Sequence, residues 1–143
     1  MKNLTLPYWG RISHIVSEQK TAVFLCQDST ELYRLDFGKD PVTLDTDVLP
    51  TPMTAMTAMP DGMVILLGDD GKLYQTNFQG KKLKALSQET TFALMGASDD
   101  TKKPNAVAMV GGDDVLLVLY PEWLLAWRYE KHTLGAFIGA FAQ

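Results

Sequence analysis

The sequence predicts an all-β fold of three four-stranded antiparallel sheets, and a threefold internal repeat is the first observation behind this prediction. The segment "MVILLGDDGKLYQTNF" (63–78) aligns without a gap on "AVFLCQDSTELYRLDF" (22–37), 41 residues upstream. It aligns again on "DVLLVLYPEWLLAWRY" (114–129), 51 residues downstream. Each copy holds short apolar segments separated by turn signals. We expect one domain over residues 1–143, with repeat units at about 12–45, 53–86 and 105–142.

Each unit contains four short apolar segments, which we interpret as four strands. In the second unit they fall at about 53–59, 63–68, 72–78 and 82–86. The second segment of every unit is continuously apolar, as expected of a strand that is buried on both faces. We therefore predict that six residues of these segments are buried, namely Phe24, Leu25, Ile65, Leu66, Leu116 and Leu117.

The third segments alternate with a period of two, which places every second side chain on one face of a strand. Turns between segments carry glycine, which accepts a positive φ, as in Asp61-Gly62 and Asp69-Asp70-Gly71. The stretch 91–98 is the best helix candidate, but it is short and we predict no helix there. The Gly/Ala-rich end, 133–142, is predicted to be a strand. The alternating sets are Tyr33, Leu35 and Phe37 in the first unit and Leu125, Trp127 and Tyr129 in the third.

The pattern "GMVILLGDDGKLYQTNFQGK" resembles a blade of the broad β-propeller superfamilies, which include WD40-like and quinoprotein-like repeats. The resemblance extends over about residues 12–142. The Trp-Asp pair of WD40 repeats is absent, since Leu35-Asp36, Thr76-Asn77 and Trp127-Arg128 stand in its place. The resemblance implies three propeller-like blades, a partial propeller. A β-sandwich or barrel built from the same repeats is the alternative.

Three blades do not close a propeller, because closed propellers typically have four to eight. The two end sheets would then expose apolar faces, which we assign to the two alternating sets above. A second copy, another chain, or refolding into a closed sandwich would cover these faces. We therefore predict self-association or a protein partner. The segment "LTLPYW" (4–9) is predicted to add a strand to a neighbouring sheet, and an ordinary edge strand is the alternative.

Composition excludes several classes of function. The apolar fraction of 46% and charged fraction of 21% are ordinary for a soluble globular domain. The net charge of −4, without a basic patch, argues against nucleic-acid binding. No apolar run is long enough to cross a membrane, and the N-terminal residues lack the apolar core of a secretory signal. With Cys26 as the single cysteine, we expect a cytoplasmic protein without disulfides.

No catalytic arrangement can be assembled from the sequence, because a reaction site needs a nucleophile with a base, converging acids or a metal cluster. We interpret His14 and His132 as structural or surface residues, and Cys26 as a small core residue. The acidic doublets lack calcium-loop spacing and are interpreted as turn residues. We expect no enzyme, no metal and no cofactor. The doublets are Asp69-Asp70, Asp99-Asp100 and Asp113-Asp114, and four methionines assigned to the core are Met53, Met56, Met59 and Met63.

A candidate binding rim combines one turn of each later unit with a long connection. Trp123 aligns with the charged residues Glu31 and Lys72, which suggests that its indole contacts a partner; packing within the chain is the alternative. In a four-stranded meander, the turn between strands two and three lies at the same end as the connection 87–104. We predict a non-enzymatic protein-interaction or scaffold module; the alternative is a small-ligand or carbohydrate-binding propeller formed by self-association, with Trp123 and Tyr120 as stacking platforms. The predicted partner-binding residues are Tyr120, Pro121, Glu122, Trp123, Asp69, Asp70 and Phe92.

Overall fold

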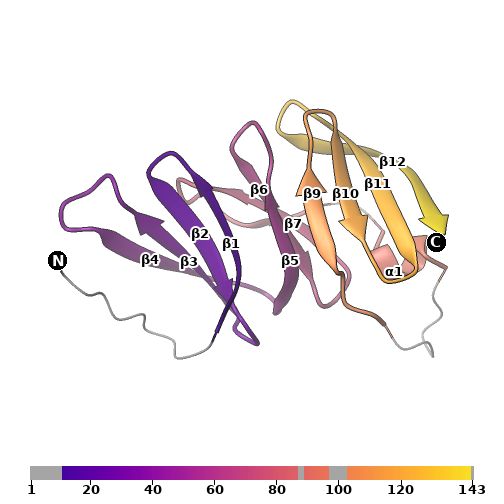
Figure 1. Ribbon diagram of the computed structural model, residues 1–143, viewed down its shortest axis with the longest axis horizontal. Helices are drawn as coiled ribbons and strands as arrows, with labels where there is room; N and C mark the ends of the chain where they lie inside the picture. Colours follow the sequence, from indigo (N-terminus) through magenta and orange to yellow (C-terminus); the bar gives the residue numbers. More distant parts are fainter. Residues whose placement is uncertain (1–10, 87–88, 97–102, 143) are drawn as a thin grey trace.

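The computed structural model describes residues 11–86, 89–96 and 103–142, and its architecture is three four-stranded antiparallel sheets that stand side by side like blades of a fan (Figure 1). This confirms the predicted all-β fold of three sheets. Each sheet is a simple meander in which every strand pairs with its neighbours in the chain. The segment 4–9, predicted to form an additional strand, lies outside the described residues, as does the doublet Asp99-Asp100.

The strand boundaries follow the turn signals of the sequence. Gly62, Gly71 and Gly80 all adopt positive φ, between 78° and 94°, at the ends of strands. Sheet 1 contains β1 (Ile12–Glu18), β2 (Thr21–Cys26), β3 (Glu31–Asp36) and β4 (Thr43–Val48). Sheet 2 contains β5 (Met53–Ala58), β6 (Met63–Gly68), β7 (Leu73–Asn77) and β8 (Lys84–Ala85). Sheet 3 contains β9 (Ala108–Gly111), β10 (Val115–Leu119), β11 (Trp123–Glu130) and β12 (Thr133–Ala142).

A one-turn helix, α1 (Thr91–Leu94), lies in the connection between sheets 2 and 3, where we predicted no helix. Thr90 caps it, since its side chain accepts a hydrogen bond from the backbone N–H of Ala93. Phe92 of this turn packs against Gly71: a Cβ added at Gly71 would lie 2.7 Å from the Phe92 ring. Tertiary packing therefore stabilises a turn that is too short to form alone.

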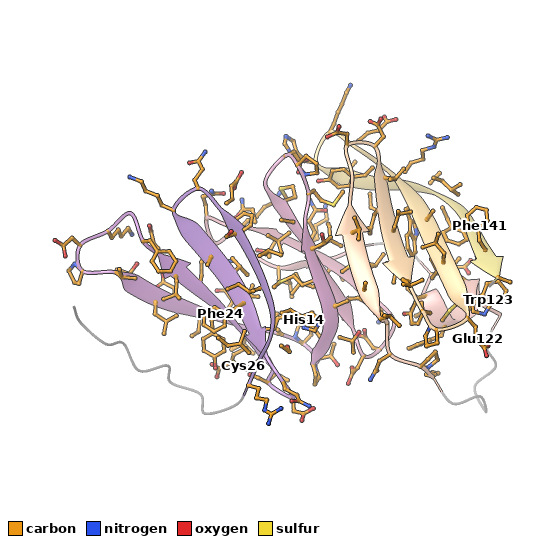
Figure 2. The ribbon with its side chains drawn as sticks, in the orientation of Figure 1. His14, Phe24, Cys26, Glu122, Trp123 and Phe141 are labelled. Carbon is orange, nitrogen blue, oxygen red and sulfur yellow. The ribbon has the colours of Figure 1, made fainter. Side chains whose placement is uncertain are left out.

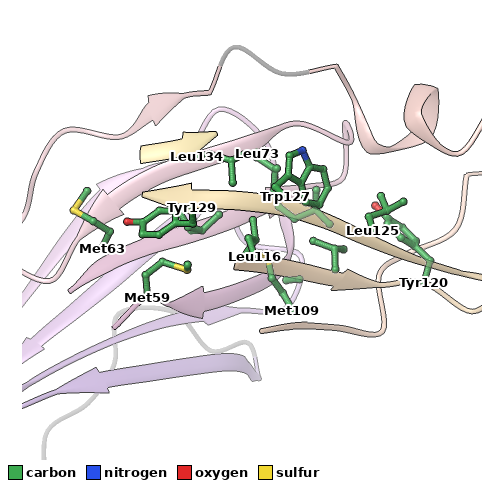
Figure 3. Packing of buried hydrophobic residues seen from close by; sticks show 14 of the residues in the cluster. Met59, Met63, Leu73, Met109, Leu116, Tyr120, Leu125, Trp127, Tyr129 and Leu134 are labelled. Atoms are coloured by element: carbon green, nitrogen blue, oxygen red, sulfur yellow. The ribbon is translucent and has the colours of Figure 1, made fainter. Parts of the chain in front are cut away.

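Two layers of apolar side chains hold the three sheets together. Sheets 1 and 2 enclose a cluster that includes Val23, Leu25 and Leu66. Sheets 2 and 3 enclose a larger cluster, in which Trp127 is fully buried and lies 5.2 Å from Phe137 between ring centroids (Figure 3). The four methionines predicted to fill the core are all buried.

The structure corrects the ungapped alignment of the first two repeat units, because β6 is shifted by one residue. Leu25 pairs with Leu32 in sheet 1, and Leu67 pairs with Leu73 in sheet 2. Since Leu32 and Leu73 are equivalent, Leu25 corresponds to Leu67, 42 residues on, and not to Leu66. The turn before β6 is one residue longer than its counterpart and the turn after it one residue shorter. Because these two length differences cancel, an ungapped alignment of the sequence does not reveal them.

The sets assigned to the end faces also need correction. Leu125, Trp127 and Tyr129 do not face outward but pack against sheet 2, at 0%, 0% and 2% exposure. On the far side of sheet 1, Tyr33 is buried as well, whereas Phe37 is exposed. Five of the six residues predicted to be buried are buried. The prediction for Leu117 is wrong: this residue is half-buried, because it points away from sheet 2.

Candidate interaction surfaces

The three segments of the predicted rim lie together at one end of sheets 2 and 3, and we call this end the helix rim: residues 69–71, α1 and residues 120–123. Hydrogen bonds join its three segments. The backbone N–H of Thr91 donates to the carbonyl of Gly71 at 2.8 Å. The hydroxyls of Thr91 and Tyr120 lie 2.6 Å apart and are buried. The structure therefore brings together three segments that are well separated in the sequence.

Two of the predicted contact residues anchor the helix rim from inside. Tyr120 is 1% exposed and Phe92 is 6% exposed, so neither offers a free face to a partner. Burial raises the pKa of the Tyr120 phenol, and the hydrogen bond with Thr91 partly offsets this effect. The ammonium of Lys103 lies 5.2 Å from the centroid of the Phe92 ring, within range of a cation–π interaction.

The other predicted residues reach the surface of the helix rim to different degrees. Pro121, Glu122 and Asp69 are exposed, whereas Asp70 and Trp123 are half-buried. Trp123 packs one side of its indole on the core between sheets 2 and 3. Figure 2 shows Glu122 and Trp123 side by side at the end of the molecule that carries the C-terminus. This part of the rim presents an indole beside a carboxylate.

The two aspartates of the helix rim are engaged in hydrogen bonds that shape its first turn. Asp70 accepts bonds from the Tyr74 hydroxyl at 2.7 Å and from the backbone N–H of Lys72 at 3.0 Å. Burial, together with Asp70, raises the pKa of Tyr74 to about 12. Asp69 accepts a hydrogen bond from the hydroxyl of Thr51. These carboxylates hold the rim in shape, and Asp69 remains accessible.

A second cluster, at the opposite end of the same two sheets, was missed by the sequence analysis. We call it the histidine cluster: Asp61, Tyr129 and His132. The Nδ1 atom of His132 lies 2.8 Å from a carboxylate oxygen of Asp61. The Tyr129 hydroxyl donates to both oxygens of the same carboxylate, at 2.8 and 3.1 Å. Burial, followed by Asp61, raises the pKa of Tyr129 strongly.

A cavity of about 340 Å³ opens beside the histidine cluster. Among the described residues, its lining includes no serine, threonine or cysteine whose hydroxyl or thiol the Asp61–His132 pair could activate. The cluster instead joins two sheets: Asp61 follows β5, while Tyr129 and His132 belong to β11 and the turn after it. The amide of Gln75 adds a 2.7 Å hydrogen bond to the carbonyl of His132. The cavity is lined by Pro60, Asp61, Asp113, Tyr129, Lys131 and His132.

Sheets 1 and 2 are joined by a buried arginine, and an open groove lies nearby. Arg34 of β3 donates to Asp47 at 2.7 Å and to the carbonyl of Asn77 at 3.1 Å. The groove, about 620 Å³ in volume, is largely apolar, and Val48 at its edge is 82% exposed. It is lined by Asp47, Val48, Leu49, Pro50, Tyr74, Lys82, Leu83 and Ala85.

The remaining candidates for chemistry take part in no reaction site within the described residues. Cys26 is buried, as predicted for a small core residue, and burial followed by Glu31 raises the pKa of its thiol. His14 is half-buried on β1, and burial lowers its pKa. Over residues 11–86, 89–96 and 103–142, no three His, Cys, Asp or Glu side chains are grouped to hold a metal ion. The same part of the chain contains no helix able to span a membrane.

No protein-family profile and no curated protein matches the sequence. Solved structures do match the fold. The N-terminal domain of Nup159 superposes with a TM-score of 0.62 at 13% identity, over 99% of this chain and 34% of that one. AztD from Citrobacter koseri superposes with a TM-score of 0.67 at 15% identity, over 99% and 38% of the two chains. A complex of S. cerevisiae Dbp5 with Nup159, Gle1, IP6 and ADP gives a TM-score of 0.60 at 12% identity, over 97% and 34%.

At these identities the likeness shows the fold and no more. The Nup159 domain is a β-propeller, so the three sheets have the architecture of neighbouring propeller blades. The chain spans only 34% and 38% of the lengths of Nup159 and AztD. The part of each neighbour that this chain does not match is therefore larger than the part it does.

Proposed function

We propose that the protein is a non-enzymatic, cytoplasmic interaction module that binds a protein partner through its helix rim as one subunit of a larger assembly. The observation that carries this proposal is Trp123, a half-buried indole at the start of β11, directly after a turn that the buried Tyr120–Thr91 hydrogen bond holds in position. Tryptophan on a rigid support is the side chain most often found at the energetic centre of protein interfaces.

The surroundings of Trp123 support a protein rather than a small molecule as the partner. Glu122 and Pro121 extend the exposed surface on one side, and Asp69 offers a further carboxylate. A stacking platform for a sugar needs an exposed aromatic face, and Tyr120 has none at 1% exposure. One of the solved structures with a similar fold also contains Nup159 in a protein complex, with Dbp5 and Gle1. The net charge of −4 disfavours nucleic acid.

Photo-crosslinking in the native host tests the proposal. A photoreactive amino acid replaces Glu122 in the full chain, and a matched control carries it at Lys39, an exposed position on the turn after β3. We expect a discrete adduct from position 122 only, and its loss when Trp123→Ala is added. Equal adducts from both positions, or an adduct that survives Trp123→Ala, would contradict the proposed site.

A further inference from the structure

Each sheet of the fan has two different faces, and each internal junction joins one face of each kind. We call the face toward the preceding sheet the front face and the face toward the following sheet the back face. The front face of sheet 2 packs on the back face of sheet 1, and the front face of sheet 3 packs on the back face of sheet 2. Among the described residues, no sheet covers the front face of sheet 1 or the back face of sheet 3, at the two ends of the fan (Figure 1).

Positions that are buried at the internal junctions are exposed on the front face of sheet 1. Ile15, Met56 and Met109 are equivalent, because each lies on the first strand of its sheet, opposite the same position of the second strand. Met56 and Met109 are 7% and 8% exposed, whereas Ile15 is 62% exposed. Phe37 and Phe78 are equivalent in directly following the third strand, and they are 56% and 2% exposed. The front face of sheet 1 therefore lacks the neighbour that covers the other two front faces.

The exposed side chains of this front face lie beside an aromatic pair that is already buried. The Phe24 and Tyr33 rings stack with their centroids 5.1 Å apart, and each residue is 1% exposed. Ile15 is the partner of Phe24 across β1 and β2, and Phe37 lies four residues beyond Tyr33 on the same side of the chain. A neighbouring sheet would therefore contact Ile15 and Phe37 rather than the two stacked rings.

The back face of sheet 3 shows the same contrast with its internal counterpart. Leu119 occupies in sheet 3 the place of Leu67 in sheet 2, since each pairs with the equivalent leucine of the third strand. Leu67 is 1% exposed and packs against sheet 3, whereas Leu119 is only half-buried. Val110 and Phe141, which strand pairing places on the same face, are 56% and 52% exposed. The back face of sheet 3 therefore presents the positions that meet a front face elsewhere in the fold.

We propose that two copies of this chain close head to tail into a ring of six sheets, in which the back face of sheet 3 of each copy packs on the front face of sheet 1 of the other. The repeat selects this pairing, because a back face meets a front face at both internal junctions and the chain carries one uncovered face of each kind. Closure selects the number of copies: three sheets are too few for a closed propeller, and six lie within the usual four to eight. The two new junctions are identical, and the ring leaves no end face uncovered. The inference goes beyond the proposed function, because it concerns the two end faces and not the helix rim.

Sedimentation of the purified full chain tests the ring. Wild type should sediment as a dimer, at twice the 15.9 kDa of one chain. Ile15→Lys and Phe141→Lys, one on each end face, should each raise the dimer dissociation constant at least about tenfold, because each places a charge in both junctions. The matched control is Val107→Lys, at a 63% exposed position directly before β9 and outside both end faces, and it should leave the constant unchanged. Circular dichroism shows whether the variants remain folded.

Mixing the two variants separates the possible arrangements. A mixed pair keeps one junction with both faces unchanged, so labelled Ile15→Lys chain should bind Phe141→Lys chain more tightly than either variant binds itself. If the back face of sheet 3 paired with its own copy instead, Ile15→Lys would dimerise like wild type, and this result would overturn the proposal. A monomeric wild type, or an open polymer of head-to-tail contacts that do not close, would overturn it too. Adduct formation at position 122 does not enter this result, so the two proposals fail separately.

Discussion

The two end sheets of the molecule carry similar aromatic and aliphatic side chains on their outer sides, yet two phenylalanines among them differ sharply in exposure. Phe24, on the far side of sheet 1, is 1% exposed, and Phe141, on the side of sheet 3 that points away from sheet 2, is 52% exposed. Both belong to strands of a repeating unit and both point away from sheet 2. The comparison teaches that the repeat specifies which residues can face a neighbouring sheet, while their burial depends on what lies beyond them.

The difference also separates stability from binding. An apolar side chain that is already buried contributes to the free energy of unfolding of the isolated chain. One that is exposed contributes little until a partner covers it. Phe24 and Tyr33 of sheet 1 should therefore behave as core, and Phe141 of sheet 3 as surface.

Alanine substitution of the two phenylalanines tests this comparison most strongly. Phe24→Ala should lower the free energy of unfolding by about 3–5 kcal/mol, because it leaves a cavity beside Tyr33. Phe141→Ala should lower it by less than about 1 kcal/mol at a concentration where the chain is monomeric. Urea denaturation measures both values. Equal losses would show that the two end faces are equally buried.

A leucine pair sharpens the same comparison within the second strands. Leu66→Ala should cost about 2–5 kcal/mol, because Leu66 is fully buried between sheets 1 and 2. Leu117→Ala should lower the free energy of unfolding clearly less, since Leu117 is only half-buried, on the side of sheet 3 that points away from sheet 2. The urea midpoints of the two variants give the answer. An unchanged midpoint for Leu66→Ala would contradict its place in the core.

The dependence of stability on alkaline pH tests the environment of Tyr74 in β7 of the middle sheet. The pKa of Tyr74 is raised from 10.0 to about 12 in the folded chain. A group whose pKa is raised on folding contributes stability that is fully present below its unfolded pKa and lost as pH rises toward its folded pKa. Stability should therefore decline between about pH 10 and 12, and Tyr74→Phe should flatten that decline. Thermal melts of wild type and of Tyr74→Phe across this range measure it.

The smallest effect is expected at the histidine cluster. His132 is largely exposed, and exposed ion pairs contribute about 0–1 kcal/mol. His132→Ala should therefore change the free energy of unfolding, measured by urea denaturation at pH 6, by less than about 1 kcal/mol. A loss several times larger would mean that the bond to Asp61 is a main connection between sheets 2 and 3.

The repeat, the turns and the sheet boundaries could be predicted because they depend on local chemistry. Glycines at positive φ mark the turns, and continuous apolar runs mark the buried strands. The one-residue shift of β6 could not be seen, because in a run such as Val64-Ile65-Leu66-Leu67 an apolar residue matches another apolar residue at either offset. Alternation separates the two faces of a strand but does not say which face meets the neighbouring sheet, so Leu125, Trp127 and Tyr129 were placed on the wrong side.

Only those features of the candidate site that follow from the order of the strands could be predicted. The three segments of the helix rim could be expected at one end, because a meander places those connections together. That Tyr120 and Phe92 turn inward depends on packing around Gly71 and Thr91, which the sequence does not reveal. The contact between Asp61 and His132 joins residues 71 positions apart across two sheets, without any local signal.

The simple meander of each sheet has a consequence for how the chain folds. Every strand pairs only with strands adjacent in sequence, so each sheet can form by closing a series of short loops. Proteins rich in such local contacts fold faster than β proteins with long-range pairing. Each sheet is then a folding unit, and the three join by stacking, as in repeat proteins where structure propagates between neighbours. Amide exchange should accordingly divide the protection of the chain into three blocks that coincide with the three sheets.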